Sequence, residues 1–175
     1  LAVIANGVSV GVVNQNMAIY YTSWTDPAMY LRLFTHVMAH GDMAHYTGNF
    51  LLILAVGPSV EEKYGSGNLA LMTAITALIT GLVNIVFFKN VALLGASGIV
   101  FMLILLGSFT NIREGKLPLT VLLVGLLYIG NEIITGIGAD DNISHISHIL
   151  GGLCGAGFGV FFHRDKIRHK ENVLT

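Results

Sequence analysis

Long runs of apolar residues, separated by short polar stretches, constrain the fold of this 175-residue chain more than any other feature. Hydrophobic residues make up 54% of the sequence and charged residues only 11%, which is more apolar surface than a soluble domain can bury. A helix needs about 20 apolar residues to cross the hydrocarbon core of a bilayer. The alternation typical of barrel strands is absent, so helices are the only way to satisfy the backbone in lipid. The sequence therefore predicts an all-α, polytopic membrane protein.

We expect six transmembrane helices in one bundle, which forms a single membrane domain over residues 1–175. Residues 1–13 have no basic leader or small-residue cleavage site, so they are interpreted as the end of a first span, with a processed signal peptide as the alternative. The connection at about 14–44 mixes aromatic and polar residues, and we expect it to be partly helical and partly embedded at the outer face. The predicted spans are about 1–13, 45–60, 68–88, 97–112, 118–136 and 145–162.

The distribution of Lys and Arg predicts the orientation of these spans. Seven of the nine basic residues lie in the loops after the second and fourth spans or in the tail at 163–175, and only Arg32 and Lys89 lie on the opposite side. By the positive-inside rule, both termini are expected to be cytoplasmic. The net charge is −1 and no basic stripe is interleaved with aromatic residues, so nucleic acid is not expected as a partner.

Polar residues far apart in the sequence are predicted to meet at one depth of the bilayer. In this topology the second, fourth and sixth spans all enter from the outer face, so their N-terminal ends share one level. The second span begins near His45 and Asn49, the fourth at Ser97, and the sixth near His145 and His148. Ionisable groups inside a membrane are costly and tend to mark functional sites.

A serine, an imidazole and hydrogen-bond donors at one level favour acyl-transfer chemistry. Serine becomes a nucleophile when an adjacent base accepts its proton, and histidine can do so near neutral pH. At the start of a helix, Ser97 would lie beside backbone N–H groups that have no intrahelical partner and could hold an oxyanion. His45 and Asn49 are four residues apart, hence on one face of their helix, and could donate to the same oxyanion. Asp140 and Asp141 are more typical of a solvated turn, so a Ser–His dyad is the simpler hypothesis.

Glycine spacing separates two candidate bases. Gly151 and Gly155 lie three and seven residues after His148, on its face of the helix, where they would let the sixth span press against the fourth. Gly95 and Gly98 bracket Ser97 in the same way. We therefore predict His148 as the base, with His145, one turn nearer the surface, as the alternative.

Three short motifs in this order resemble those of the rhomboid intramembrane serine proteases. "GASG" at 95–98 is similar to their G-x-S-G motif, "HYTGN" at 45–49 to their H-x-x-x-N motif, and "HILG" at 148–151 to the H-x-x-G of their last core helix. The similarity extends over about 30–163 and implies a six-span rhomboid core. It also implies a serine endopeptidase of the bacterial plasma (inner) membrane that cleaves transmembrane segments of other proteins within the lipid bilayer, without metal or cofactor.

The resemblance also implies roles for individual residues. Ser97 would be the nucleophile and His148 the general base, while His45, Asn49 and the backbone N–H of Ser97 would form the oxyanion hole. Arg32 and Glu61 match positions that are structural in the family. Two residues depart from its pattern. Phe101 stands where a tyrosine often stacks on the catalytic histidine, and Leu31 stands where an aromatic residue usually precedes the arginine.

Two other functions remain possible from the sequence. A catalytically inactive rhomboid-like protein would bind transmembrane helices with the same fold, although such relatives usually lack the serine or the histidine. A small transporter could line a path with polar residues such as Asn84, Asn131 and Glu132. Such a path would need to continue through the inner half of the bilayer, where nothing comparably polar follows.

Overall fold

The computed structural model describes the fold of residues 16–108 and 142–173 and the side chains of 16–108 and 145–162. This part of the chain is mostly helical. The predicted spans 1–13 and 118–136 lie outside the described residues, as does the end of the span predicted at 97–112. The helices are α2 (Pro27–Thr35), the 3₁₀ helix η1 (His36–Met38), α3 (Met43–Tyr64), α4 (Ser66–Phe87), α5 (Ser97–Ser108) and α7 (Asn142–Val173).

Helices α3 and α4 form a hairpin whose ends are set by local sequence. Asp42 caps α3, because its side chain accepts a 2.7 Å hydrogen bond from the backbone N–H of His45. Gly65 alone separates the two helices, and its φ of +82° is a left-handed conformation that favours glycine. The backbone N–H of Gly65 donates to the carbonyl of Glu61, which closes the last turn of α3.

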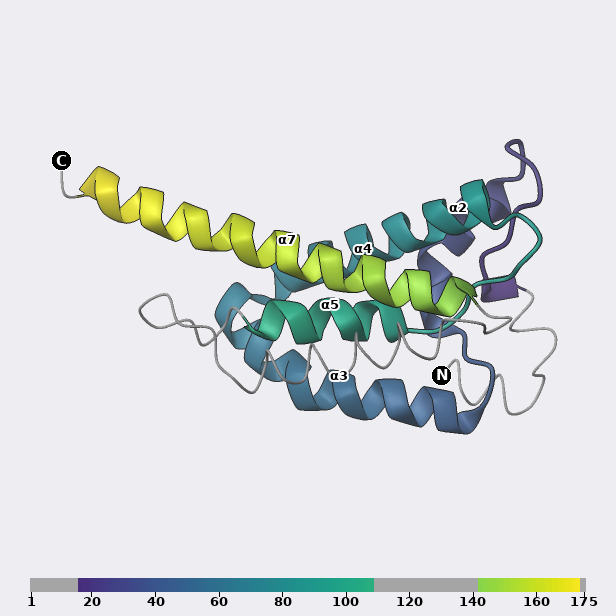
Figure 1. Cartoon of the computed structure of the whole chain (residues 1–175), viewed down its shortest axis with the longest axis horizontal. Helices are drawn as coiled ribbons and strands as arrows, with labels where there is room; N and C mark the ends of the chain where they lie inside the picture. Colours follow the sequence, from purple (N-terminus) through teal and green to yellow (C-terminus); the bar gives the residue numbers. More distant parts are fainter. Residues whose placement is uncertain (1–15, 109–141, 174–175) are drawn as a thin grey trace.

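Helix α5 lies at the centre of the described bundle and contacts α3, α4 and α7. Figure 1 shows that α3, α5 and α7 all begin at the same end of the bundle, whereas α4 runs in the opposite direction. Almost every residue of α5 is buried, as expected for a helix that is apolar on all sides. Its core contacts include Val60 and Tyr64 of α3 and Met72 and Ala77 of α4.

Two helical segments are long and apolar enough to cross a membrane, namely residues 66–87 and 145–162, among the residues that the structure describes. The helices over the predicted second and third spans begin two residues earlier than expected, at Met43 and Ser66. Helix α7 differs more, because it continues to Val173, through most of the segment predicted as the tail. In Figure 1 its C-terminal part extends beyond the other helices.

The segment before α3 packs on one end of α4. Met29 and Leu33 of α2 are buried against Ile85 of α4, together with Ile19 and Leu93, which form an antiparallel bridge. Arg32 is also buried, and forms a 2.9 Å ion pair with Asp26. The hydrogen bond from Thr22, together with the Arg32 guanidinium, lowers the pKa of Asp26. Arg32 therefore holds this segment together, whereas Leu31 is exposed.

Candidate active site

The turn that leads into α5 is tied to the segment around η1. The backbone N–H of Gly95 donates to the carbonyl of His36 at 3.0 Å, and the N–H of Ala96 donates to Nε2 of His40 at 3.4 Å. Asn84, buried on α4, donates to the carbonyls of Ile19 and Val91. These bonds fix the backbone immediately before Ser97, which is the first residue of α5 and is partly exposed.

His40 is a residue that sequence reasoning missed. Its Nε2 accepts from Ala96, so the hydrogen-bond network assigns the proton to Nδ1, which lies 3.3 Å from the carbonyl of Met38. Burial and the neighbouring His45 ring both lower the pKa of His40, which favours this neutral form. Two histidines shortly before the second predicted span were the available signal, but the partner of His40 lies 56 residues away in the chain.

His36, in η1, links the segment around η1 to α4. Its Nε2 lies 3.4 Å from the hydroxyl of Thr80 on α4, and its Nδ1 lies 3.2 Å from the carbonyl of Arg32. The side chain is 1% exposed. Burial lowers the pKa of His36 to about 4, so the ring is neutral at physiological pH.

His148 of α7 lies over the first turn of α5. Its imidazole stacks on the ring of Phe101, with 4.5 Å between ring centroids and 9° between planes. Because Phe101 follows Ser97 by four residues, the two side chains lie on one face of α5. The structure therefore brings His148 to the face of α5 that carries Ser97. His145 is half-buried and lies one turn nearer the start of α7.

Glycines allow α7 to approach α5 at this level. A Cβ at Gly151 would overlap the carbonyl oxygen of Gly98, and a Cβ at Gly155 would overlap that of Met102. A Cβ at Gly98 would in turn lie 3.4 Å from the carbonyl oxygen of Ser147. The two backbones are therefore in direct contact over two turns, which holds His148 beside α5.

His45 and Asn49 of α3 converge on the turn before Ser97. A Cβ at Gly95 would lie 2.9 Å from Nε2 of His45 and 3.9 Å from Nδ2 of Asn49. Gly95 thus lies outside the helix with φ of +116°, where its missing side chain leaves room for these two polar groups. Within the described residues, the buried Nδ2 of Asn49 has no hydrogen-bond partner. A buried amide donor therefore lies beside Gly95, two residues before Ser97 in the chain.

The other polar residues considered from the sequence have different places. Asn84 uses its amide to hold backbone carbonyls, so its role is structural, and Asn131 and Glu132 lie outside the described residues. Glu61 accepts a 2.6 Å hydrogen bond from Ser66 across the α3–α4 turn. The described residues contain no group of three His, Cys, Asp or Glu side chains that could hold a metal ion.

Apolar helices that carry these polar groups at one end of the bundle define a helical membrane protein. The rhomboid domain model matches residues 27–165, and this chain therefore belongs to the rhomboid family. It is similar to rhomboid protease GluP of Bacillus subtilis, with 33% identity over 130 residues. It is also similar to rhomboid protease GlpG of Salmonella paratyphi A, with 30% identity over 107 residues.

These two relatives are longer proteins. The match to GluP covers 73% of this chain and 25% of GluP, and the match to GlpG covers 59% of this chain and 38% of GlpG. The chain thus spans well under half the length of either relative. Both relatives are named as proteases.

Proposed function

We propose that this chain is a serine endopeptidase that hydrolyses peptide bonds in or near transmembrane segments of other membrane proteins. The observation that carries the proposal is the stack of His148 on Phe101, one turn after Ser97. The names of the relatives support the same chemistry. We further propose the six-span topology with both termini in the cytoplasm, in the plasma (inner) membrane, as the distribution of Lys and Arg predicts.

In this mechanism Oγ of Ser97 attacks the carbonyl carbon of the scissile bond while His148 accepts the hydroxyl proton. The tetrahedral oxyanion is held by the backbone N–H of Ser97 with His45 and Asn49. His148 then gives its proton to the leaving amine, and the C–N bond breaks to leave an acyl-enzyme. Water, activated by the same imidazole, hydrolyses the ester and restores Ser97. The buried Nδ2 of Asn49, which has no hydrogen-bond partner among the described residues, supports its place among the oxyanion donors.

The test is cleavage of a single-span reporter protein by the purified chain in liposomes. We expect Ser97→Ala and His148→Ala each to abolish cleavage while the helical content is unchanged. Asn49→Ala should lower kcat by roughly 10²–10³-fold, the typical cost of one oxyanion donor. Activity that survives His148→Ala but is lost in His145→Ala would identify the other histidine as the base.

A fluorophosphonate probe separates hydrolysis from helix binding alone. We expect the probe to label the wild type but not Ser97→Ala, because only an activated serine reacts readily. A folded wild type that binds the reporter but is neither labelled nor active would indicate an inactive rhomboid-like protein. Solute uptake that survives Ser97→Ala in proteoliposomes would instead indicate a transporter.

A further inference from the structure

His40 lies between two parts of the candidate active site that are far apart in the sequence. Its imidazole meets the ring of His45 edge to face, with 5.1 Å between ring centroids and 73° between planes. Its Nε2 lies 3.4 Å from the backbone nitrogen of Ala96, the residue immediately before Ser97. One side chain therefore touches both a histidine and a turn that would hold the oxyanion in the proposed hydrolysis.

Further contacts hold the imidazole of His40 in one orientation. The ring packs edge to face on Tyr46, with 5.3 Å between ring centroids and 89° between planes. Its Nδ1 lies 3.3 Å from the carbonyl oxygen of Met38, and the residue is buried. Rotation of the ring would break at least one of these contacts. A side chain locked in this way can position the groups that it touches.

The bond between His40 and Ala96 requires a neutral imidazole. The backbone N–H is the donor, so Nε2 must supply a lone pair, and a protonated imidazole has none. The titratable side chains that the structure places against His40 come from the start of α3, and they are Asp42, His45 and Tyr46. Burial and the His45 ring lower the pKa of His40, whereas the Asp42 carboxylate acts in the opposite direction. A proton on His40 therefore turns the acceptor of this bond into a second donor.

We propose that His40 is a positioning residue for the proposed hydrolysis, on which this inference rests, and that it acts only in its neutral form. Its imidazole holds the backbone at Ala96 and the ring of His45 in the geometry that the oxyanion needs. It works through these two groups and does not itself contact the scissile bond. Protonation of His40 releases Ala96, so the oxyanion donors lose their alignment in acid and hydrolysis slows.

Two substitutions separate the hydrogen bond of His40 from its ring, with reporter cleavage in liposomes at neutral pH as the measurement. His40→Phe keeps a ring against His45 and Tyr46 but leaves the N–H of Ala96 without this acceptor. His40→Gln removes the ring but offers an amide oxygen near the place of Nε2. From the typical effect of one neutral hydrogen bond, we expect kcat to fall roughly tenfold in His40→Phe and to stay within about threefold of the wild type in His40→Gln, with KM unchanged in both. Equal kcat in the two variants would overturn the proposal.

The pH dependence of kcat is a readout that a purely structural role would not move. In the wild type both His148 and His40 must be neutral, so log kcat should fall by more than about one unit per pH unit in acid. A single titrating base gives a slope of at most about one, which is the slope expected for His40→Gln. Circular dichroism of the same samples confines the comparison to pH values at which the helices are intact. A wild-type slope no steeper than that of His40→Gln would overturn the proposal.

Nuclear magnetic resonance of the whole chain, labelled with ¹⁵N at alanine, tests the contact without any cleavage. The amide signal of Ala96 should shift with pH in the wild type, with a midpoint below 6.5, and should stay constant in His40→Gln. Asp42→Asn is the matched control, because asparagine still caps α3 but the lost charge should move the midpoint to lower pH. A constant Ala96 signal in the wild type would overturn the proposal. A chain that shows these shifts but does not cleave the reporter would refute the hydrolysis and still support the proton-controlled contact.

Discussion

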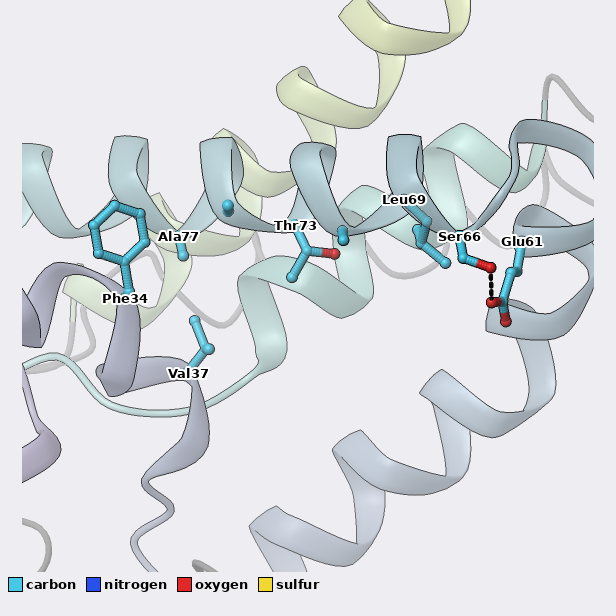
Figure 2. Close-up of a pocket in the computed structure, with 9 residues that line it drawn as sticks. Phe34, Val37, Glu61, Ser66, Leu69, Thr73 and Ala77 are labelled. Carbon is cyan, nitrogen blue, oxygen red and sulfur yellow. Dashed lines mark hydrogen bonds between the residues drawn. The ribbon is translucent and has the colours of Figure 1, made fainter.

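The contact between α5 and α7 and the contact between α2 and α4 both depend on small residues, but they differ along their length. Glycines bring the backbones of α5 and α7 together over two turns, at Gly98–Gly151 and at Met102–Gly155. Helix α2 approaches α4 closely at Gly81, where a Cβ would lie 3.0 Å from Cδ2 of Leu33. Toward Ser66, beyond this contact, lies a groove of about 450 Å³ (Figure 2), whose lining includes Phe34, Val37 and Ala70. The contact that holds His148 is therefore closed, whereas the described residues leave free space on the other side.

The largest effect is expected from a side chain placed in the closed contact. Gly151→Leu should lower the free energy of unfolding by about 3 kcal/mol or more, because backbone atoms of Gly98 cannot move aside. Gly157→Leu on the same helix is the matched control, since a Cβ at Gly157 meets nothing within 4 Å. Unfolding in detergent measures both variants. Equal stability of the two would show that α5 and α7 are not in backbone contact.

A second prediction concerns the pH dependence of stability, to which His36 contributes beside α4. His36 has its pKa lowered from 6.5 to about 4 by burial, so the unfolded chain binds a proton at a higher pH than the folded one. The stabilising contribution of neutral His36 is therefore complete above pH 6.5 and is lost as the pH falls toward 4. At about 1.4 kcal/mol per pKa unit, the full loss is about 3 kcal/mol.

The measurement is the free energy of unfolding in detergent across this pH range, for the wild type and for His36→Gln. Glutamine retains hydrogen-bonding groups for Thr80 and the Arg32 carbonyl but does not titrate. We expect the variant to show a shallower loss of stability between pH 6.5 and 4. Parallel curves for both proteins would rule out His36 as the titrating group.

These contacts also explain what could be predicted from the sequence. Helical spacing was enough to place Gly151 and Gly155 on the face of His148, because that spacing is local. The starts of α2 and α3 follow from Asp26 and Asp42, which accept hydrogen bonds from backbone N–H groups two and three residues later. These features depend on at most eight consecutive residues, so the sequence contains them directly.

The parts that sequence reasoning missed depend on long-range pairing. His36 contacts Thr80, 44 residues away, and His40 accepts from Ala96, 56 residues away. Neither histidine has an asparagine four residues later, as His45 does, and no local pattern indicates its partner. Gly95 was predicted to serve helix packing, yet it lies in the turn before α5, where its positive φ and its contact with His45 depend on the position of α3.

A smaller effect is expected where His148 of α7 stacks on Phe101 of α5. Phe101→Leu keeps an apolar side chain in place but removes the ring face on which His148 lies. The loss of an aromatic pair is worth about 1 kcal/mol, so we expect kcat to fall about fivefold with KM unchanged. Phe101→Tyr keeps the ring and is the control. If leucine and tyrosine variants cleave the reporter at equal rates, the stack does not orient His148.

The smallest effect is expected in the groove beside α4. It tests whether this side of α4 has free space. Ala70→Leu adds apolar volume at an exposed groove position, and the added atoms enter free space rather than displacing backbone. We therefore expect the free energy of unfolding to change by less than about 0.5 kcal/mol, as at an ordinary surface position. Gly81→Leu, where the same two helices are in close contact, should cost roughly 1–3 kcal/mol in the same assay. Similar losses at both positions would mean that the space beside Ala70 is already filled.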